Sequence, residues 1–229
     1  YDQVIHDVAI QNLHVVFCLD RGGVVGADGP THHGAYDLAY MRCIPNMVVA
    51  APMDEVELRN MMYSASQLHN GPYSIRYPRG TGSIVDWKQP FEALPIGKGR
   101  RLQNGNDIAI LSIGAIGTQA NEACEALAQR GISAAHYDMR FAKPIDEMIL
   151  HEVFGKFKHV ITLEDGCIMG GFGSAVLEFM GDQGYQAQVR RLGLPDRYVE
   201  HGTQAELYAE NGYDAASVVA CAEEMAAQA

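Results

Sequence analysis

The sequence of 229 residues lacks a long hydrophobic run, an excess of positive charge and any paired spacing of its cysteines. No apolar stretch approaches the ~20 residues of a membrane-spanning helix, so we expect no membrane partner. The net charge of −11 argues against nucleic acid as a partner, because phosphate backbones bind to basic surfaces. The hydrophobic content of 48 % predicts a folded core and excludes a disordered chain.

The cysteines are odd in number and follow neither a disulfide nor a zinc pattern. They are Cys18, Cys43, Cys124, Cys167 and Cys221. Most of them stand among apolar neighbours, where a thiol acts as a small hydrophobic group. We therefore expect reduced core cysteines in a cytoplasmic protein.

The sequence also lacks an initiating methionine. The segment YDQVIHDVAIQNL at its start resembles the middle of an amphipathic helix, with no capping residue and no signal-peptide pattern. The expectation is that an upstream part of the polypeptide is missing.

The chain contains a repeated alternation of short apolar strands and amphipathic helices. Strands are predicted at 14–20, 47–51, 73–77, 108–113, 132–139, 159–165 and 188–194. Helices are predicted at 35–42, from a cap at Asp54 with Glu57, from Thr118 to Gly131, at 146–154, from Ser174, and twice at the end, the last from Asp214. This alternation predicts an α/β fold with parallel sheets covered by helices.

The periodicity disappears in the middle of the chain, where Pro, Gly and polar residues dominate. We predict a linker at 81–106, lying across the surface, between two α/β units at 1–80 and 107–229. The first unit is expected to be truncated at its amino end.

A glycine-rich loop, RGGVVGADGPTHHG at 21–34, and a second loop, PRGTG at 78–82, each follow a predicted strand. Ligands of open α/β sheets bind at the carboxyl ends of the strands, so the two loops are candidates for one site. Arg21 and Arg79 could grip a phosphate or carboxylate. Asp28 could accept a hydrogen bond from a hydroxyl, and His32 could transfer a proton near neutral pH. Ordinary turn chemistry explains the Asp-Gly-Pro sequence equally well.

Other candidates have simpler structural explanations. Adjacent His32 and His33 do not predict a metal site, because no third ligand lies at a suitable spacing. Glycines 170–173 could bind an anion at a helix start, but close packing of the helix on a strand is favoured. The Glu164-Asp165 pair is interpreted as a solvated turn. Arg190 and Arg191 are interpreted as surface charge on an edge strand, and Met61, Met62 and Met169 as core residues.

Six segments, taken in order, resemble the 1-deoxy-D-xylulose-5-phosphate synthase family, which is related to the transketolases. They are DRGGVVGADGPTHHGAYDLAYMRCIPNM, RYPRG, LPIGKG, DMRFAKPID, EDGCIMGGFGSAV and LGLPDRYVEHGTQAEL. No single segment is decisive, but together they cover essentially the whole chain.

The resemblance implies a thiamine-diphosphate-dependent and Mg²⁺-dependent transferase. Such enzymes condense pyruvate with glyceraldehyde 3-phosphate and release carbon dioxide, and their product is used to make isoprenoids, thiamine and pyridoxal. Members are homodimers with three α/β domains. This chain would match the later half of the second domain, which binds the cofactor's pyrimidine ring, and all of the third, carboxy-terminal domain.

The resemblance also implies roles for four residues. Arg21 and Arg79 match arginines that help to hold the phosphate of the aldehyde. Asp28 matches a residue near substrate hydroxyls, and His32 one near the proton transfers. The main cofactor and metal ligands of the family would lie upstream of Tyr1, so the chain alone is expected to be inactive and to need the upstream polypeptide.

Two alternatives stay open from the sequence. The first is a related transketolase or a β-type subunit of a 2-oxoacid dehydrogenase, which the MRFAKPID and LPD segments disfavour. The second is a non-catalytic dimerisation module, which the missing cofactor ligands suggest. An isolated half-domain would, however, expose a torn sheet edge and a hydrophobic face, which disfavours this alternative.

Overall fold

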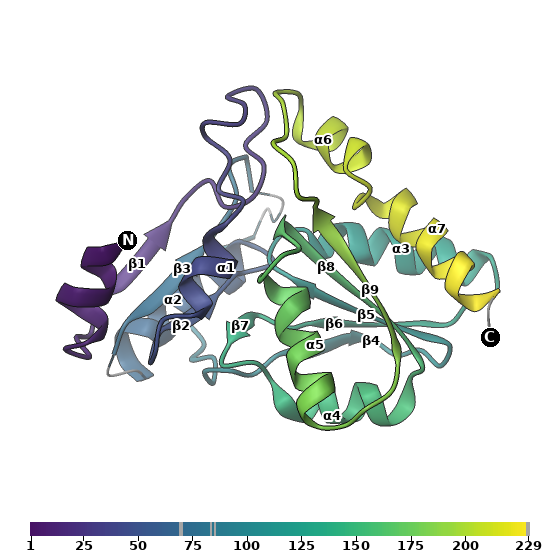
Figure 1. The fold of residues 1–229 in the computed structure, drawn as a ribbon, viewed down its shortest axis with the longest axis horizontal. Coiled ribbons are helices and arrows are strands. Elements are labelled where there is room, and N and C mark those ends of the chain that lie inside the picture. The colour runs from purple at the N-terminus through teal and green to yellow at the C-terminus, as the bar shows by residue number, and fades with distance from the viewer. Residues whose placement is uncertain (69–70, 83, 85, 228–229) are drawn as a thin grey trace.

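The computed structural model describes residues 1–68, 71–82, 84 and 86–227. These residues form two α/β units, each built on its own sheet (Figure 1). The fold class predicted from the alternation of strands and helices is therefore confirmed. No helix in these ranges is both long and apolar enough to cross a membrane.

The first sheet has the strand order β1-β3-β2-β7. Its strands are β1 (Val16–Leu19), β3 (Tyr73–Arg76), β2 (Val48–Ala50) and β7 (Phe141–Lys143). The first three run parallel, and β7 pairs antiparallel with β2. A π-helix (Val4–Ala9), α1 (Asp37–Arg42) and α2 (Glu55–Leu68) complete this unit.

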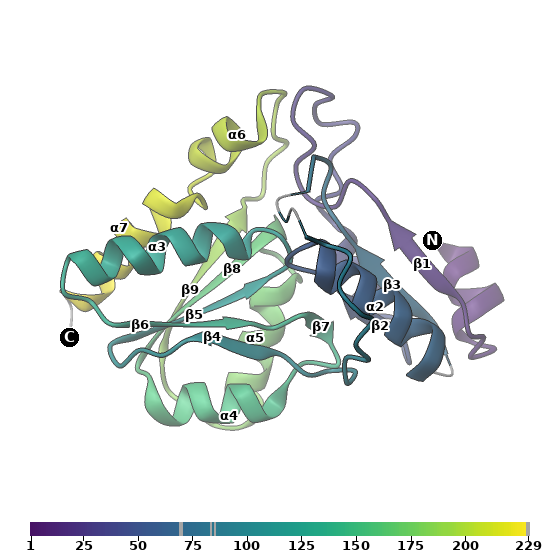
Figure 2. The ribbon, with the colours of Figure 1, turned by 180° about the vertical axis from the view of Figure 1, so that it is seen from behind.

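The second sheet has the strand order β4-β6-β5-β8-β9. Its strands are β4 (Arg100–Gln103), β6 (Ala134–Asp138), β5 (Ile108–Ile113), β8 (His159–Cys167) and β9 (Gln188–Leu194). All of them are parallel except β4. Helices α3 (Gly117–Gln129) and α7 (Ala215–Ala226) cover one face, and α4 (Glu147–Lys156) and α5 (Phe172–Asp182) cover the other (Figure 2). The short α6 (Gln204–Glu210) lies before α7.

The central strand β5 shows why its sequence is almost entirely apolar. Every residue of β5 is buried. Ile108 and Ile110 join the core beneath α3 and α7, whereas Ala109 and Leu111 join the core beneath α4 and α5. A strand covered on both faces favours apolar side chains. The polar residue of β5, Ser112, is buried with its hydroxyl 2.8 Å from His136 Nε2.

The predicted linker does more than cross the surface. It contributes β4 to the second sheet, and Leu94 is buried in the core of the first unit with Phe141. Ser83 and Val85 of this segment lie outside the described residues. Strands β4 and β7 were missed because both are short, and β4 is an antiparallel edge strand of mostly polar, partly exposed residues.

Some details of the helices and core differ from prediction. Helix α3 begins at Gly117, and the Thr118 hydroxyl donates to the Ala115 carbonyl in place of a cap. Helix α5 begins at Phe172, before the predicted Ser174. Met61 and Cys124 are buried as expected, but Met62, Met169, Cys18 and Cys43 are exposed. The prediction that these last four are core residues is wrong, because all four stand on the solvent side of their segments.

Candidate functional site

The glycine-rich loop at 21–34 follows β1 and lies beside the segment that leads into α6 (Figure 1). Gly23 and Gly34 exchange main-chain hydrogen bonds of 2.9 Å, which close the base of the loop. The second loop, 78–82, follows β3, the neighbour of β1. Both loops therefore leave the same edge of the first sheet, where parallel sheets bind ligands.

The main chain of the loop is fixed at Val24 and Val25. The Val24 N–H donates to Asp165 Oδ1 (3.0 Å), and its carbonyl accepts from Gln204 Nε2 (2.9 Å). The Val25 N–H donates to His33 Nδ1 (3.0 Å), and its carbonyl accepts from Arg79 Nη1 (2.9 Å). Four different side chains thus hold four consecutive polar groups, which gives the loop one defined conformation.

The glycine content of the loop has a geometric reason at Gly23. Its φ is +82°, a region that favours glycine. A Cβ atom at this position would overlap the Asp165 carboxylate. Glycine therefore lets the loop approach the second unit closely.

Of the four predicted site residues, the structure brings Arg79 and Asp28 together. Arg79 Nη1 lies 3.6 Å from Asp28 Oδ2, and both side chains are partly exposed. His32 is exposed, and its Nδ1 lies 2.9 Å from the Thr31 hydroxyl. Arg21 is exposed and pairs with Asp20. Within the described part of the chain, neither His32 nor Arg21 has a direct polar contact with Arg79 or Asp28.

A cavity of about 420 Å³ opens beside Arg79. Its lining comes from the segments after β2 and β3, from the starts of α2 and α3, and from α6. It includes Asp54, Glu55, Tyr77, Arg79, Thr118, Gln204 and Tyr208. Arg79 gives this mixed polar and apolar cavity a grip for a phosphate or carboxylate. No group of three or more His, Cys, Asp or Glu side chains in the described ranges could hold a metal. The same lining also carries the carboxylates of Asp54 and Glu55, so the cavity presents charges of both signs.

A buried ion pair lies beneath the loop and was missed from the sequence. Arg76 Nε donates to Asp37 Oδ2 (2.8 Å), and both side chains are 5 % exposed. Arg76 Nη2 also donates to the carbonyls of Asp165 (2.8 Å) and Gly34 (3.2 Å). Burial lowers the pKa of Arg76, but the Asp37 carboxylate outweighs it, and the net shift is upward. A charged residue inside the apolar strand YSIRY was the available signal, since buried charges need partners.

Glu164 and Asp165 do not form a solvated turn, because both are buried. The Asp165 carboxylate also accepts hydrogen bonds from the Tyr213 (3.1 Å) and Tyr208 (3.2 Å) hydroxyls. Burial raises the pKa of Asp165, and Arg76 partly opposes this effect. The prediction failed because two adjacent carboxylates seldom find enough partners in a core, whereas here they do.

Glu164 caps α5 from inside the protein. Its carboxylate accepts from the Phe172 N–H (2.7 Å) and the Gly173 N–H (2.8 Å). Burial raises the pKa of Glu164 to about 7, although these two hydrogen bonds lower it. A Cβ at Gly171 would overlap this carboxylate, so the packing explanation of the glycines is confirmed. The helix start already has a carboxylate of the protein itself as its anion.

The two arginines of β9 differ from each other. Arg190 is exposed and lies 3.7 Å from Glu224, as predicted for surface charge on an edge strand. Arg191 is half-buried and donates to the Ser174 hydroxyl (3.0 Å) and to the Ile168 carbonyl. The interpretation of Arg191 as surface charge is therefore wrong, because it fixes the turn before α5.

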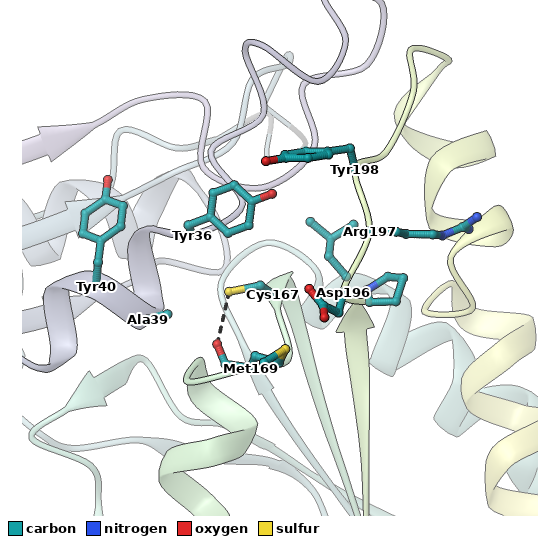
Figure 3. Close-up of a pocket in the computed structure, with 10 residues that line it drawn as sticks. Tyr36, Ala39, Tyr40, Cys167, Met169, Asp196, Arg197 and Tyr198 are labelled. Carbon is teal, nitrogen blue, oxygen red and sulfur yellow. Dashed lines mark hydrogen bonds between the residues drawn. The ribbon is translucent and has the colours of Figure 1, made fainter.

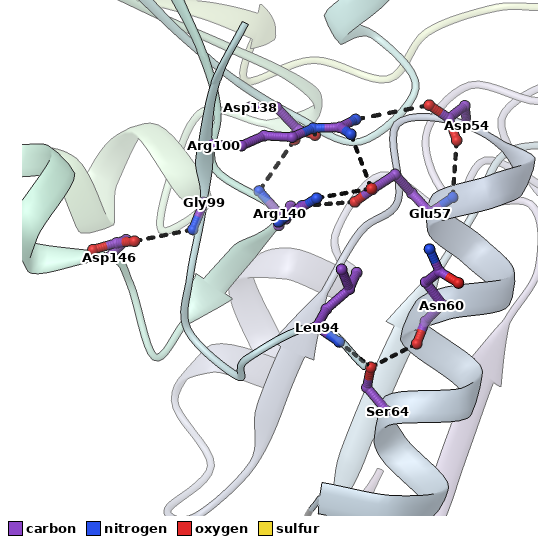
Figure 4. A network of polar contacts seen from close by, with 10 residues as sticks. All are labelled: Asp54, Glu57, Asn60, Ser64, Leu94, Gly99, Arg100, Asp138, Arg140 and Asp146. Atoms are coloured by element: carbon purple, nitrogen blue, oxygen red, sulfur yellow. Dashed lines mark hydrogen bonds and ion pairs between the residues drawn. The ribbon is translucent and has the colours of Figure 1, made fainter. Parts of the chain in front are cut away.

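A network of ion pairs joins the two units behind the cavity (Figure 4). The Glu57 carboxylate accepts from Arg140 Nε (2.6 Å) and Arg100 Nη1 (2.9 Å). Arg100 Nε also donates to Asp138 Oδ2 (3.0 Å), and burial raises the pKa of Asp138 to about 6. As predicted, Asp54 caps α2 through the Glu57 N–H (2.8 Å), but the Glu57 side chain serves this network.

A second cavity, of about 550 Å³, lies between α1 and the segment after β9 (Figure 3). Tyr36, Tyr40, Cys167 and Tyr198 are among its lining residues, and none of the four predicted site residues is. Burial raises the pKa of the Cys167 thiol to about 11, and this thiol donates to the Met169 carbonyl. A neutral thiol is a poor nucleophile, so Cys167 does not supply this cavity with an activated nucleophile.

Comparison with known proteins places the chain in a family. Residues 1–83 match the pyrimidine binding domain of transketolase, and residues 97–218 match the transketolase C-terminal domain. A solved structure described as a split gene transketolase, inactive beta4 tetramer, superposes with a TM-score of 0.86 at 30 % identity, covering 99 % of this chain and 71 % of that one.

Curated relatives are more similar in sequence. The 1-deoxy-D-xylulose-5-phosphate synthase of Cytophaga hutchinsonii is 66 % identical over 95 % of this chain and 34 % of that protein. The synthase of Bacteroides fragilis is 59 % identical over 93 % of this chain and 33 % of that protein. The chain spans about a third of the length of these relatives. Because a pyrimidine-binding domain is followed by a transketolase C-terminal domain along the chain, the chain belongs to the transketolase family.

Proposed function

We propose that the chain is the carboxy-terminal part of a 1-deoxy-D-xylulose-5-phosphate synthase, which condenses pyruvate with glyceraldehyde 3-phosphate and releases carbon dioxide. The observation that carries the proposal is the identity of 66 % with such a synthase over 95 % of the chain. The division at 81–106, with a pyrimidine-binding part before it and a C-terminal domain after it, belongs to the same proposal.

We assign the site to the two loops at the end of β1 and β3. Arg79, with Arg21, holds the phosphate of the aldehyde. Asp28 accepts hydrogen bonds from substrate hydroxyls, and His32 moves protons to and from the reacting oxygen atoms. Three features support the assignment: exposed ionisable groups, a fixed main chain and a cavity beside Arg79.

Thiamine diphosphate with Mg²⁺ is the proposed cofactor, and it supplies a stabilised carbanion equivalent for carbon–carbon bond formation. Its diphosphate and metal are assigned to the upstream polypeptide, because the described residues lack a metal-ligand set. A homodimer in the cytoplasm is also proposed, and the five free cysteines agree with a reducing compartment.

The reaction is tested with the full-length protein, thiamine diphosphate and Mg²⁺. Formation of 1-deoxy-D-xylulose 5-phosphate from pyruvate and glyceraldehyde 3-phosphate is expected. Preference for a sugar-phosphate donor over pyruvate would favour transketolase chemistry instead. Inactivity with either donor would favour the non-catalytic dimerisation module.

The site is tested with His32→Ala in the full-length protein. Loss of a positioned proton-transfer group should lower kcat by about a hundredfold or more. His6→Ala is the matched control, because His6 is also exposed but lies on the π-helix, away from the loop. Turnover of His32→Ala equal to that of His6→Ala would remove His32 from the site.

A further inference from the structure

Val24 of the glycine-rich loop is held at both of its main-chain groups by the second unit. It is fully buried, its N–H donates to Asp165, and its carbonyl accepts from Gln204. These partners are separated from Val24 by 141 and 180 residues in sequence. Neither partner belongs to the two loops that carry the proposed site.

Further contacts follow the same loop along the second unit. The Gly202 N–H points at the Gly26 carbonyl (3.5 Å), and His33 Nε2 lies 3.4 Å from the Glu200 carbonyl. The Cys167 N–H donates to the carbonyl of Ala35, just after the loop (2.7 Å). The loop therefore contacts the second unit at Val24, Gly26 and His33, and again just after its end at Ala35.

Asp165 is itself held from several sides. Tyr208 and Tyr213 donate to its carboxylate, and Arg76 donates to its carbonyl. With its partners fixed, the carboxylate has one orientation, in which Oδ1 faces the Val24 N–H. Such a preorganised contact constrains the loop without touching a ligand.

The main chain at Val24 and Val25 is directly connected to Arg79, the residue proposed to bind the phosphate. Arg79 Nη1, which binds the carbonyl of Val25, is also the atom nearest to Asp28. A shift of the main chain at Val24 would move this carbonyl and, with it, the guanidinium. The position of Val24 thus sets the position of Arg79.

We propose that Asp165 and Gln204 are positioning residues, through which the second unit fixes the loop at Val24 and so aligns Arg79 for the phosphorylated aldehyde. This inference rests on the proposed function of the loop. It gives the C-terminal domain a defined part in substrate binding. Asp165 acts from beneath the loop, whereas Gln204 also lines the cavity beside Arg79.

The test compares Asp165→Ala with Asp146→Ala in the full-length enzyme with its cofactor. Asp146 is also a buried carboxylate of the second unit, but its partners are Lys98, Gly99 and the start of α4. Two quantities are measured for each variant: amide hydrogen exchange of the peptide 21–34 without substrates, and the KM values for both substrates.

For Asp165→Ala, exchange in the loop should be about tenfold faster or more, because a charge-assisted hydrogen bond is lost. The KM for glyceraldehyde 3-phosphate should rise by about tenfold, and the KM for pyruvate should change less. Asp146→Ala should be destabilised while retaining normal loop exchange and normal KM values. Equal loop exchange in the two variants, or an equal rise of both KM values, would overturn the inference.

Gln204→Ala keeps the test decisive if Asp165→Ala does not fold. Gln204 is only partly buried and lies on α6, so its loss should leave the core intact. A neutral hydrogen bond is lost, and loop exchange should be about threefold to tenfold faster. Unchanged exchange in Gln204→Ala would overturn the inference. Faster exchange in a full-length protein that makes no 1-deoxy-D-xylulose 5-phosphate would leave the positioning intact and reject the proposed function.

Discussion

Two Asp–Arg pairs lie in the loop region, one in an exposed layer and one in a buried layer beneath it, and we expect them to have different roles. On the outside, Asp28 and Arg79 lie 3.6 Å apart with side chains 36 % and 46 % exposed. Beneath them, Asp37 and Arg76 lie 2.8 Å apart and are each 5 % exposed. The exposed pair costs little to separate, and its members are available to a ligand. The buried pair would leave an uncompensated charge if it were broken, so it fixes structure.

The largest effect is expected from breaking the buried pair. Arg76→Ala would leave the Asp37 carboxylate buried without its cation and should lower the free energy of unfolding by about 3–5 kcal/mol. Urea denaturation of the full-length protein measures this change. Replacing both partners together, as Arg76→Met with Asp37→Leu, should recover part of the loss, because the Asp37 carboxylate is then no longer buried without its cation. A loss below 1 kcal/mol in Arg76→Ala would contradict the distinction between the two layers.

A smaller, pH-dependent effect is expected at Glu164. Its pKa is raised from the ordinary 4.5 to about 7 by burial, so the folded state binds this proton more tightly than the unfolded state does. Its contribution to stability should therefore fall as the pH rises from about 4.5 to about 7, and stay level above that range. Glu164→Gln cannot ionise and lacks this contribution.

The measurement for Glu164 is the difference in unfolding free energy between wild type and Glu164→Gln across this pH range. As the pH rises through this range, the unfolding free energy of the wild type should fall relative to that of Glu164→Gln by on the order of 1 kcal/mol or more. Asp138, whose pKa is raised to about 6, contributes equally to both proteins. A difference that does not vary between pH 5 and pH 7 would show that the buried carboxylate titrates normally.

The contrast between the layers also shows what could be predicted from the sequence. The alternation of apolar strands and helices predicted the two parallel-sheet units, because a doubly covered strand such as β5 consists almost entirely of apolar residues. The two glycine-rich loops could be placed at strand ends for the same reason. Short polar strands such as β4 carry too weak a pattern for this kind of prediction.

The supports of the loop could not be predicted in the same way. Asp165 and Gln204 reach Val24 only because the chain folds back across more than a hundred residues. Local sequence patterns do not indicate which distant residues will be in contact, so Glu164 and Asp165 were interpreted as a solvated turn. The one local signal was Arg76, a charge inside a buried strand, which indicates that a partner must exist but does not name it.

The central claim is that the exposed layer binds substrate while the buried layer holds the fold, and Arg79→Ala in the full-length enzyme tests it most directly. Its KM for glyceraldehyde 3-phosphate should rise by about tenfold or more, while its unfolding free energy changes by about 1 kcal/mol or less. Arg101→Ala is the matched control, because Arg101 is 48 % exposed and pairs with Glu152, away from the loop. An unchanged KM in Arg79→Ala, equal to that of Arg101→Ala, would contradict the account.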